Sequence, residues 1–135
     1  MIVDTSYVLD IIDENEAALA KEHELETANV PLVIPAMTIL ELYIGVGKVA
    51  NTAEERQQVE SILESYPQVA MTPSISRRAG RILGEALAAS EPGEGPGIGK
   101  GDAAIAATAI ERDEPVLAGD SHFGAIDGVA LETYR

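Results

Sequence analysis

Two acidic residues occupy positions from which a parallel α/β fold can direct side chains to one point. Asp4 directly follows the segment 1–3, which we predict to be a short buried strand. Asp102 opens the alanine-rich segment 101–110, whose apolar character on nearly all sides predicts a central, buried helix. Carboxylates at a strand end and at a helix start can bind a hard divalent cation. The sequence therefore predicts a metal site that contains both acids.

Two further acids extend this candidate site. Glu41 lies inside a predicted apolar helix, and Asp120 follows the predicted strand 115–118. Each of the four acids also has a simpler explanation. Asp4 and Asp102 could cap helices, Glu41 could face solvent, and Asp120 could belong to a turn. The sequence favours a shared site because three of the four acids stand at strand ends or helix starts.

Four carboxylates in one cleft predict a bound cation, because each negative charge raises the pKa of the others. Mg²⁺ or Mn²⁺ would remove this conflict, and oxygen-only ligands suit both ions. Such a site supports hydrolysis of a phosphodiester bond by activating water and stabilising charge on the phosphoryl oxygens. Thr5 or Ser6 could hold a metal-bound water or the phosphate, and Lys100 neighbours Asp102, so these three are candidate substrate-binding residues.

Few other polar residues near these acids are candidates for chemistry. His122 lies close to Asp120 in the sequence and could contact substrate, but we interpret it as an ordinary loop residue. Arg77, Arg78 and Arg81 form a basic cluster, which we expect to pair with neighbouring acids.

The composition indicates one globular domain, residues 1–135. A hydrophobic fraction of 46% argues against disorder, and the length suffices to bury a core. The absence of cysteine excludes disulfides, thiol catalysis and Cys-ligated zinc. No apolar run approaches the roughly 18 residues that span a bilayer. We therefore expect a soluble, cytoplasmic protein that makes no membrane contact.

The net charge of −14 is extreme and would ordinarily argue against nucleic-acid binding. A divalent ion can reverse the sign locally, and high salt screens the repulsion. Acids spread over predicted outer helix faces, with few Lys and Arg residues, are typical of a salt-accumulating organism. We expect the source to be a halophilic archaeon.

Predicted strands alternate with predicted helices along the chain. This order requires crossover connections, so the sequence predicts an α/β fold with three layers, a parallel β-sheet flanked by helices. We expect Thr38 and Thr52 to begin two of the helices, Ser74 or a nearby residue to begin a third, and the Pro/Gly-rich segment 91–99 to be a loop. The expected strands are residues 2–3, 31–35, 68–71, 115–118 and 129–133.

The order of these motifs resembles that of PIN-domain nucleases over essentially the whole chain. The matching segments are Asp4-Thr5-Ser6, Glu41 in residues 38–45, Asp102 in residues 102–109, and residues 116–129 around Asp120. The resemblance implies that Asp4, Glu41 and Asp102 bind metal, that Asp120 is a fourth, more variable acid, and that a hydroxyl of Thr5 or Ser6 lies near the metal. Ala118 departs from the family pattern, which typically has Thr or Ser there.

The compact size is similar to that of VapC-type toxins. This resemblance implies a metal-dependent endoribonuclease that is the toxin of a type II toxin–antitoxin pair. Its partners would be RNA, a cognate antitoxin and a second copy of the chain in a homodimer. We expect the helix pair around Tyr43–Val46 and Val59–Leu63 to anchor the apolar residues of the antitoxin. The alternatives are a house-keeping PIN nuclease that processes RNA and a non-catalytic, acidic α/β binding module.

Overall fold

A parallel sheet lies at the centre of the molecule. The computed structural model describes residues 1–50 and 52–135. Every strand pair in this part of the chain is parallel, which confirms the predicted crossover topology. The hydrogen-bonded orders are β1-β4-β5 and β2-β3. The strands are β1 (Ile2–Val3), β2 (Ile34–Pro35), β3 (Gln68–Val69), β4 (Val116–Ala118) and β5 (Leu131–Thr133).

A single bridge between Ile2 and Val33 joins the two groups of strands, so that the strands follow one another in the order β3-β2-β1-β4-β5. The Val3 N–H donates to the carbonyl of Val33 at 3.0 Å. The next donor in this parallel ladder would belong to residue 35, and Pro35 has no N–H. The ladder between β1 and β2 therefore stops there. β1 has its predicted bounds, whereas the other four described strands are shorter than the sequence predicted.

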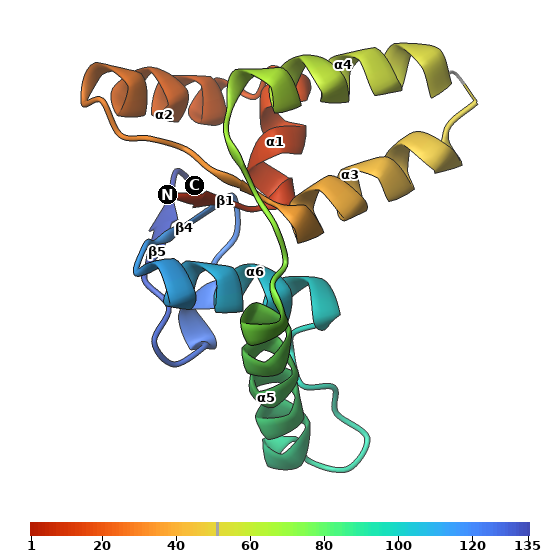
Figure 1. Ribbon diagram of the computed structural model, residues 1–135, viewed down its shortest axis with the longest axis vertical. Coiled ribbons are helices and arrows are strands. Elements are labelled where there is room, and N and C mark those ends of the chain that lie inside the picture. Colours follow the sequence, from red (N-terminus) through yellow and green to blue (C-terminus); the bar gives the residue numbers. More distant parts are fainter. Residues whose placement is uncertain (51) are drawn as a thin grey trace.

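The helices form layers on both faces of this sheet, as expected for a three-layer α/β fold (Figure 1). α1, α2 and α4 lie on one side, α6 lies on the other, and α5 packs on α6 and extends away from the sheet (Figure 1). No helix of the described residues is long and apolar enough to cross a membrane. The α-helices are α1 (Thr5–Ile12), α2 (Glu16–Thr27), α3 (Ala36–Lys48), α4 (Thr52–Ser65), α5 (Pro73–Ala89) and α6 (Lys100–Arg112).

The alanine-rich helix α6 is central, as predicted. All residues from 103 to 109 are buried. Ile105 and Ala106 pack beneath the sheet with Ile2 and Val116. On the opposite side of α6, the small side chain of Ala103 packs with Ala79 of α5. Since these contacts fill both sides of the helix, the position of its first turn is fixed by the core.

The predicted start of one helix is wrong. α3 begins at Ala36, directly after the extended Pro35, and Thr38 lies buried inside the helix. α5 begins at Pro73 with Thr72 as its N-cap, which confirms the predicted start at or near Ser74. Proline at the first helical position is favourable because its missing N–H has no partner there in any helix. The predicted start at Thr52 and the predicted loop at 91–99 are confirmed.

The Thr38 hydroxyl instead takes part in the sheet. It donates to the carbonyl of Val3 at 2.8 Å, the acceptor that Pro35 leaves without a backbone donor. We expect Thr38→Val to lower the free energy of unfolding by about 1–2 kcal/mol, because a buried carbonyl loses its partner. Urea denaturation measures this loss.

Thr108→Val is the matched control for this substitution. The buried Thr108 hydroxyl donates to Ala104 within its own helix, where the same carbonyl already accepts a helical N–H. We expect a clearly smaller loss there. Equal losses in the two variants would show that the Thr38 hydroxyl has no special role at the end of β1.

Candidate active site

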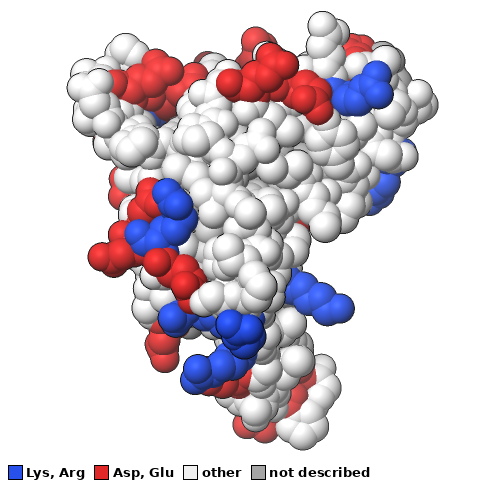
Figure 2. Space-filling model, in the orientation of Figure 1, with Lys and Arg blue, Asp and Glu red and all other residues white. Residues whose placement is uncertain are grey.

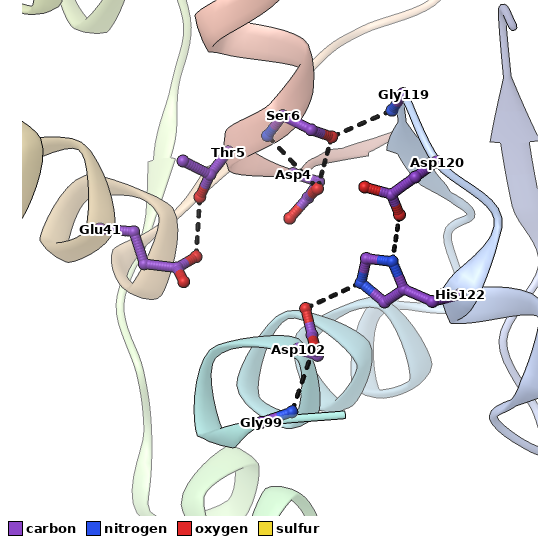
Figure 3. A network of polar contacts seen from close by, with 9 residues as sticks. All are labelled: Asp4, Thr5, Ser6, Glu41, Gly99, Asp102, Gly119, Asp120 and His122. Atoms are coloured by element: carbon purple, nitrogen blue, oxygen red, sulfur yellow. Dashed lines mark hydrogen bonds and ion pairs between the residues drawn. The ribbon is translucent and has the colours of Figure 1, made fainter. Parts of the chain in front are cut away.

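The four predicted acids come together at one edge of the sheet (Figure 3). Asp4 directly follows β1, and Asp120 follows β4, its neighbour in the sheet. Asp102 is the third residue of α6, and Glu41 lies in the first half of α3. Two strand ends and two helices therefore direct their acids toward a common region, as the parallel topology predicted.

Asp4 is the most buried of these acids, with 5% of its surface exposed. Its Oδ2 atom accepts hydrogen bonds from the Ser6 hydroxyl at 2.6 Å and from the Ser6 N–H at 3.3 Å. Asp4 is thus the N-cap of α1 as well as a member of the cluster. Burial raises the pKa of this carboxyl, and the hydrogen bonds from Ser6 and Thr5 offset only part of the rise.

Glu41 does not face open solvent, which was its simpler explanation. Its side chain turns toward the cluster, and its Oε1 atom accepts the Thr5 hydroxyl at 2.7 Å (Figure 3). Burial raises the pKa of Glu41, the Thr5 hydrogen bond opposes this rise, and the charges of Asp4 and Asp102 add to it. This electrostatic coupling places Glu41 in the same cluster as the two aspartates.

Asp102 has two roles at the start of α6. Its Oδ2 atom accepts the Gly99 N–H at 3.1 Å, which satisfies a backbone donor at the helix N-terminus. Its Oδ1 atom lies 3.0 Å from the Nε2 atom of His122. One oxygen therefore holds the helix start, and the other is directed into the cluster.

His122 belongs to this cluster, and its interpretation as an ordinary loop residue was wrong. Its ring lies between two acids: Nε2 contacts Asp102 and Nδ1 contacts Asp120 (Figure 3). The ring also stacks on Phe123, which is fully buried. Burial lowers the pKa of His122, but the Asp102 hydrogen bond and the charges of Asp102, Asp120 and Asp4 outweigh it and raise the pKa above 6.5. The only sequence signal was the spacing of two residues from Asp120.

The other predicted site residues divide into two groups. Thr5 and Ser6 contact acids directly, and the Ser6 hydroxyl also accepts the N–H of Gly119 at 3.0 Å. Asp120 is exposed beside them. Lys100 is the first residue of α6 and is exposed, and no contact with the acids is seen for it among the described residues. Ser6 therefore connects the segment after β1 to the segment after β4.

The expected pairing of the arginine cluster is confirmed for two of its members. Arg78 forms an ion pair with Glu111, and Arg81 forms a longer one with Glu85. All three arginines line one surface pocket of about 400 Å³. Figure 2 shows Lys and Arg side chains gathered over α5, away from the acidic residues of α2 and α4.

The chemistry of the cluster suits a hard divalent cation. Its acids offer only oxygen ligands, and the raised pKa values of Asp4 and Glu41 reflect negative charges that a cation would stabilise. Among residues 1–50 and 52–135, no three acidic or histidine side chains converge closely enough to hold an ion in the present conformation. Asp102 and Asp120 instead contact His122, so ion binding requires their side chains to rotate.

Comparison with known proteins assigns the chain to a family. A model of the PIN domain matches residues 1–129, so the chain belongs to the PIN-domain family. PIN domains are generally nucleases and usually use divalent metal ions. A search of curated proteins gave no significant match.

Several solved structures have the same fold. A structure of VapBC2 from Rickettsia felis bound to a promoter DNA fragment matches with a TM-score of 0.84 at 18% identity, covering 99% of this chain and 98% of that one. DNA-bound VapBC from Salmonella typhimurium matches with a TM-score of 0.82 at 20% identity, covering 99% and 97%. VapBC-5 from Mycobacterium tuberculosis matches with a TM-score of 0.66 at 24% identity, covering 99% and 96%. At these identities the matches show the shared fold.

Removal of the Glu41 charge should stabilise the metal-free protein. Because the pKa of Glu41 is raised from 4.5, the folded state binds this proton more tightly than the unfolded chain does. The folded protein therefore loses stability as the pH rises from about 4.5 through the raised pKa. Gln retains an oxygen for the Thr5 hydroxyl but has no charge. In EDTA, we expect the Tm of Glu41→Gln to exceed that of the wild type at neutral pH, with the difference disappearing in acid.

Thermal denaturation across this pH range measures the effect. Glu64→Gln, an exposed substitution on α4, should leave the Tm unchanged throughout. If the wild type and Glu41→Gln have the same Tm at neutral pH, the Glu41 charge does not destabilise the metal-free protein.

Proposed function

We propose that the chain is a Mg²⁺- or Mn²⁺-dependent endoribonuclease and the toxin of a type II toxin–antitoxin pair. The observation that supports this most directly is the convergence of Asp4, Glu41, Asp102 and Asp120 at one sheet edge of a PIN domain. These four acids would hold the ion. When bound, such an ion activates water and stabilises negative charge on a phosphodiester during hydrolysis.

The remaining site residues would prepare the acids for this role. Thr5 holds one oxygen of Glu41, and Ser6 holds one oxygen of Asp4, so both acids keep a second oxygen for the ion. Fixing ligand orientation in this way strengthens metal binding. Lys100 is exposed at the start of α6, where its ammonium group can reach a phosphate of the RNA.

We also infer that the open acidic site receives a cationic segment of an antitoxin. The net charge of −14 and the exposed Asp120 favour a basic peptide, because Arg forms bidentate bonds with carboxylates. The VapBC names of the similar structures support such a partner. Ile44, with 55% of its surface exposed on α3, could contact a second copy of the chain in the expected homodimer.

Part of the expected anchoring surface for the antitoxin, residues Tyr43–Val46 and Val59–Leu63, is accessible, because Ile44 is exposed and Ile62 lines a groove. Val46, Val59 and Leu63 are buried between α3 and α4 and cannot receive a peptide. Their helices pack directly on each other, which the amphipathic pattern alone did not reveal. The open groove of about 440 Å³ lies between α1 and α4, with Ile11, Ile12 and Ile62 among its lining residues. We propose this groove as the anchor for apolar antitoxin residues.

The nuclease proposal predicts the effect of Asp102→Asn. Asn keeps an oxygen for the Gly99 N–H, so the start of α6 should stay intact. Loss of one charged ligand of a shared ion should abolish metal-dependent RNA cleavage while the Tm remains close to that of the wild type. Cleavage of a labelled RNA over a metal titration measures this.

Asp127→Asn is the control, because Asp127 is exposed on the segment after Ile126 and lies outside the acidic cluster. It should cleave RNA like the wild type. Full activity in Asp102→Asn, with contaminating nuclease excluded, would refute the assigned site.

The toxin proposal predicts a co-purifying partner. Expression of the chain alone should arrest growth, and co-expression with the adjacent upstream reading frame should relieve the arrest and yield a complex. Ile62→Asp should weaken that complex, because it places a charge in the α1–α4 groove. Leu19→Asp, at an exposed position of α2, is the matched control and should leave it intact. If the chain alone is harmless and no partner co-purifies, the house-keeping nuclease becomes the better proposal.

A further inference from the structure

Gly101 lies against the carboxylate of Glu41. A Cβ atom built on Gly101 would lie 2.5 Å from Glu41 Oε2, 3.0 Å from its Cδ and 3.3 Å from its Oε1. Gly101 is the second residue of α6 and has no positive φ angle. Its backbone is therefore one that any residue can adopt. What requires glycine at this position is the space taken by the Glu41 carboxylate.

Other helical glycines of the described chain have no such neighbour. A Cβ atom on Gly80 or Gly84 of α5, or on Gly45 or Gly47 of α3, would meet nothing within 4 Å. Glycine inside a helix is less favourable than alanine, because it loses more backbone entropy on folding. Helix stability thus gives no reason for Gly101, whereas the contact with Glu41 does.

The Glu41 carboxylate is held from two directions. The Thr5 hydroxyl donates to Oε1 at 2.7 Å, and the bare backbone of α6 lies against Oε2. In this position the carboxylate feels the charges of Asp4 and Asp102. A long glutamate side chain on a half-exposed helix face would otherwise extend into water. The absence of a side chain at 101 leaves the room in which this carboxylate joins the cluster.

We infer that Gly101 is a positioning residue, because its lack of a side chain allows the Glu41 carboxylate to lie beside Asp102. This inference rests on the proposed metal-dependent function, because Glu41 is proposed there as a ligand. Ordinary contact begins at 3.4 Å, so a methyl group at 101, 2.5 Å from the present position of Oε2, displaces that atom by about 0.9 Å to reach ordinary contact. Functional groups tolerate displacements of only about 0.5 Å. The displaced atom is the flexible end of Glu41, so the fold accommodates the change while the ion site does not.

The test compares Gly101→Ala with Gly80→Ala, which adds the same methyl group to a helix where no atom is near. Mn²⁺ binding without RNA is measured by calorimetry, and Tm is measured in EDTA. For Gly101→Ala we expect a Tm equal to or above that of the wild type and Mn²⁺ affinity at least about tenfold weaker. For Gly80→Ala we expect wild-type Mn²⁺ affinity.

A double-mutant cycle shows whether the effect acts through Glu41. In a Glu41→Gln background, Gly101→Ala should cause little further loss of Mn²⁺ affinity. Wild-type affinity in Gly101→Ala, an undiminished loss in the Glu41→Gln background, or a Tm well below wild type would each overturn the positioning role. If the wild type itself binds no Mn²⁺, the proposed metal-dependent function is wrong, and the positioning role of Gly101, which rests on it, is wrong as well.

Discussion

Repulsion between carboxylates at the end of the central strands is the constraint on which the rest of the site depends. Burial raises the pKa of Asp4 and of Glu41, the charge of Asp120 adds to the rise at Asp4, and the charges of Asp4 and Asp102 add to the rise at Glu41. Partly buried charges of this kind are stable only if fixed hydrogen-bond donors or a cation compensate each of them. The structure supplies the donors from the Thr5 and Ser6 hydroxyls, the Gly99 N–H and the His122 ring. A divalent cation would supply the rest.

This arrangement explains why two of the acids, Asp4 and Asp102, lie at the N-termini of α1 and α6. A helix N-terminus presents unpaired N–H groups and a partial positive charge, and both favour an acid. Asp4 and Asp102 therefore serve the helices and the cluster at once, so their two explanations from sequence do not exclude each other. Glu41 has no helix terminus beside it. It depends on a hydroxyl from α1 and on the space above Gly101.

The sequence predicted the fold well where one residue type determines the local structure. Alternating apolar segments indicated the parallel sheet, and the alanines of α6 indicated its central place. The prediction for Thr38 was wrong because a threonine before an apolar run usually caps a helix. Here Pro35 lacks the N–H that would donate to the sheet, and the Thr38 hydroxyl donates in its place. The interpretation of His122 was wrong because its role depends on a contact with Asp102, which lies 20 residues earlier in the chain. Such contacts arise from tertiary packing, which local patterns do not encode.

The loop that carries Asp120 and His122 is held from both sides, and this links the end of β5 to the site. On one side the Gly119 N–H donates to Ser6. On the other, Asp10 of α1 accepts hydrogen bonds from Tyr134 and Arg135, whose side chains lie so close to Gly119 that a Cβ there would be 2.7 Å from the Tyr134 hydroxyl. A glycine thus permits close approach on this side, as Gly101 does on the other. The parallel strands bring the acids to one edge, and glycine there leaves room for the Glu41 carboxylate at Gly101 and for the Tyr134 hydroxyl at Gly119.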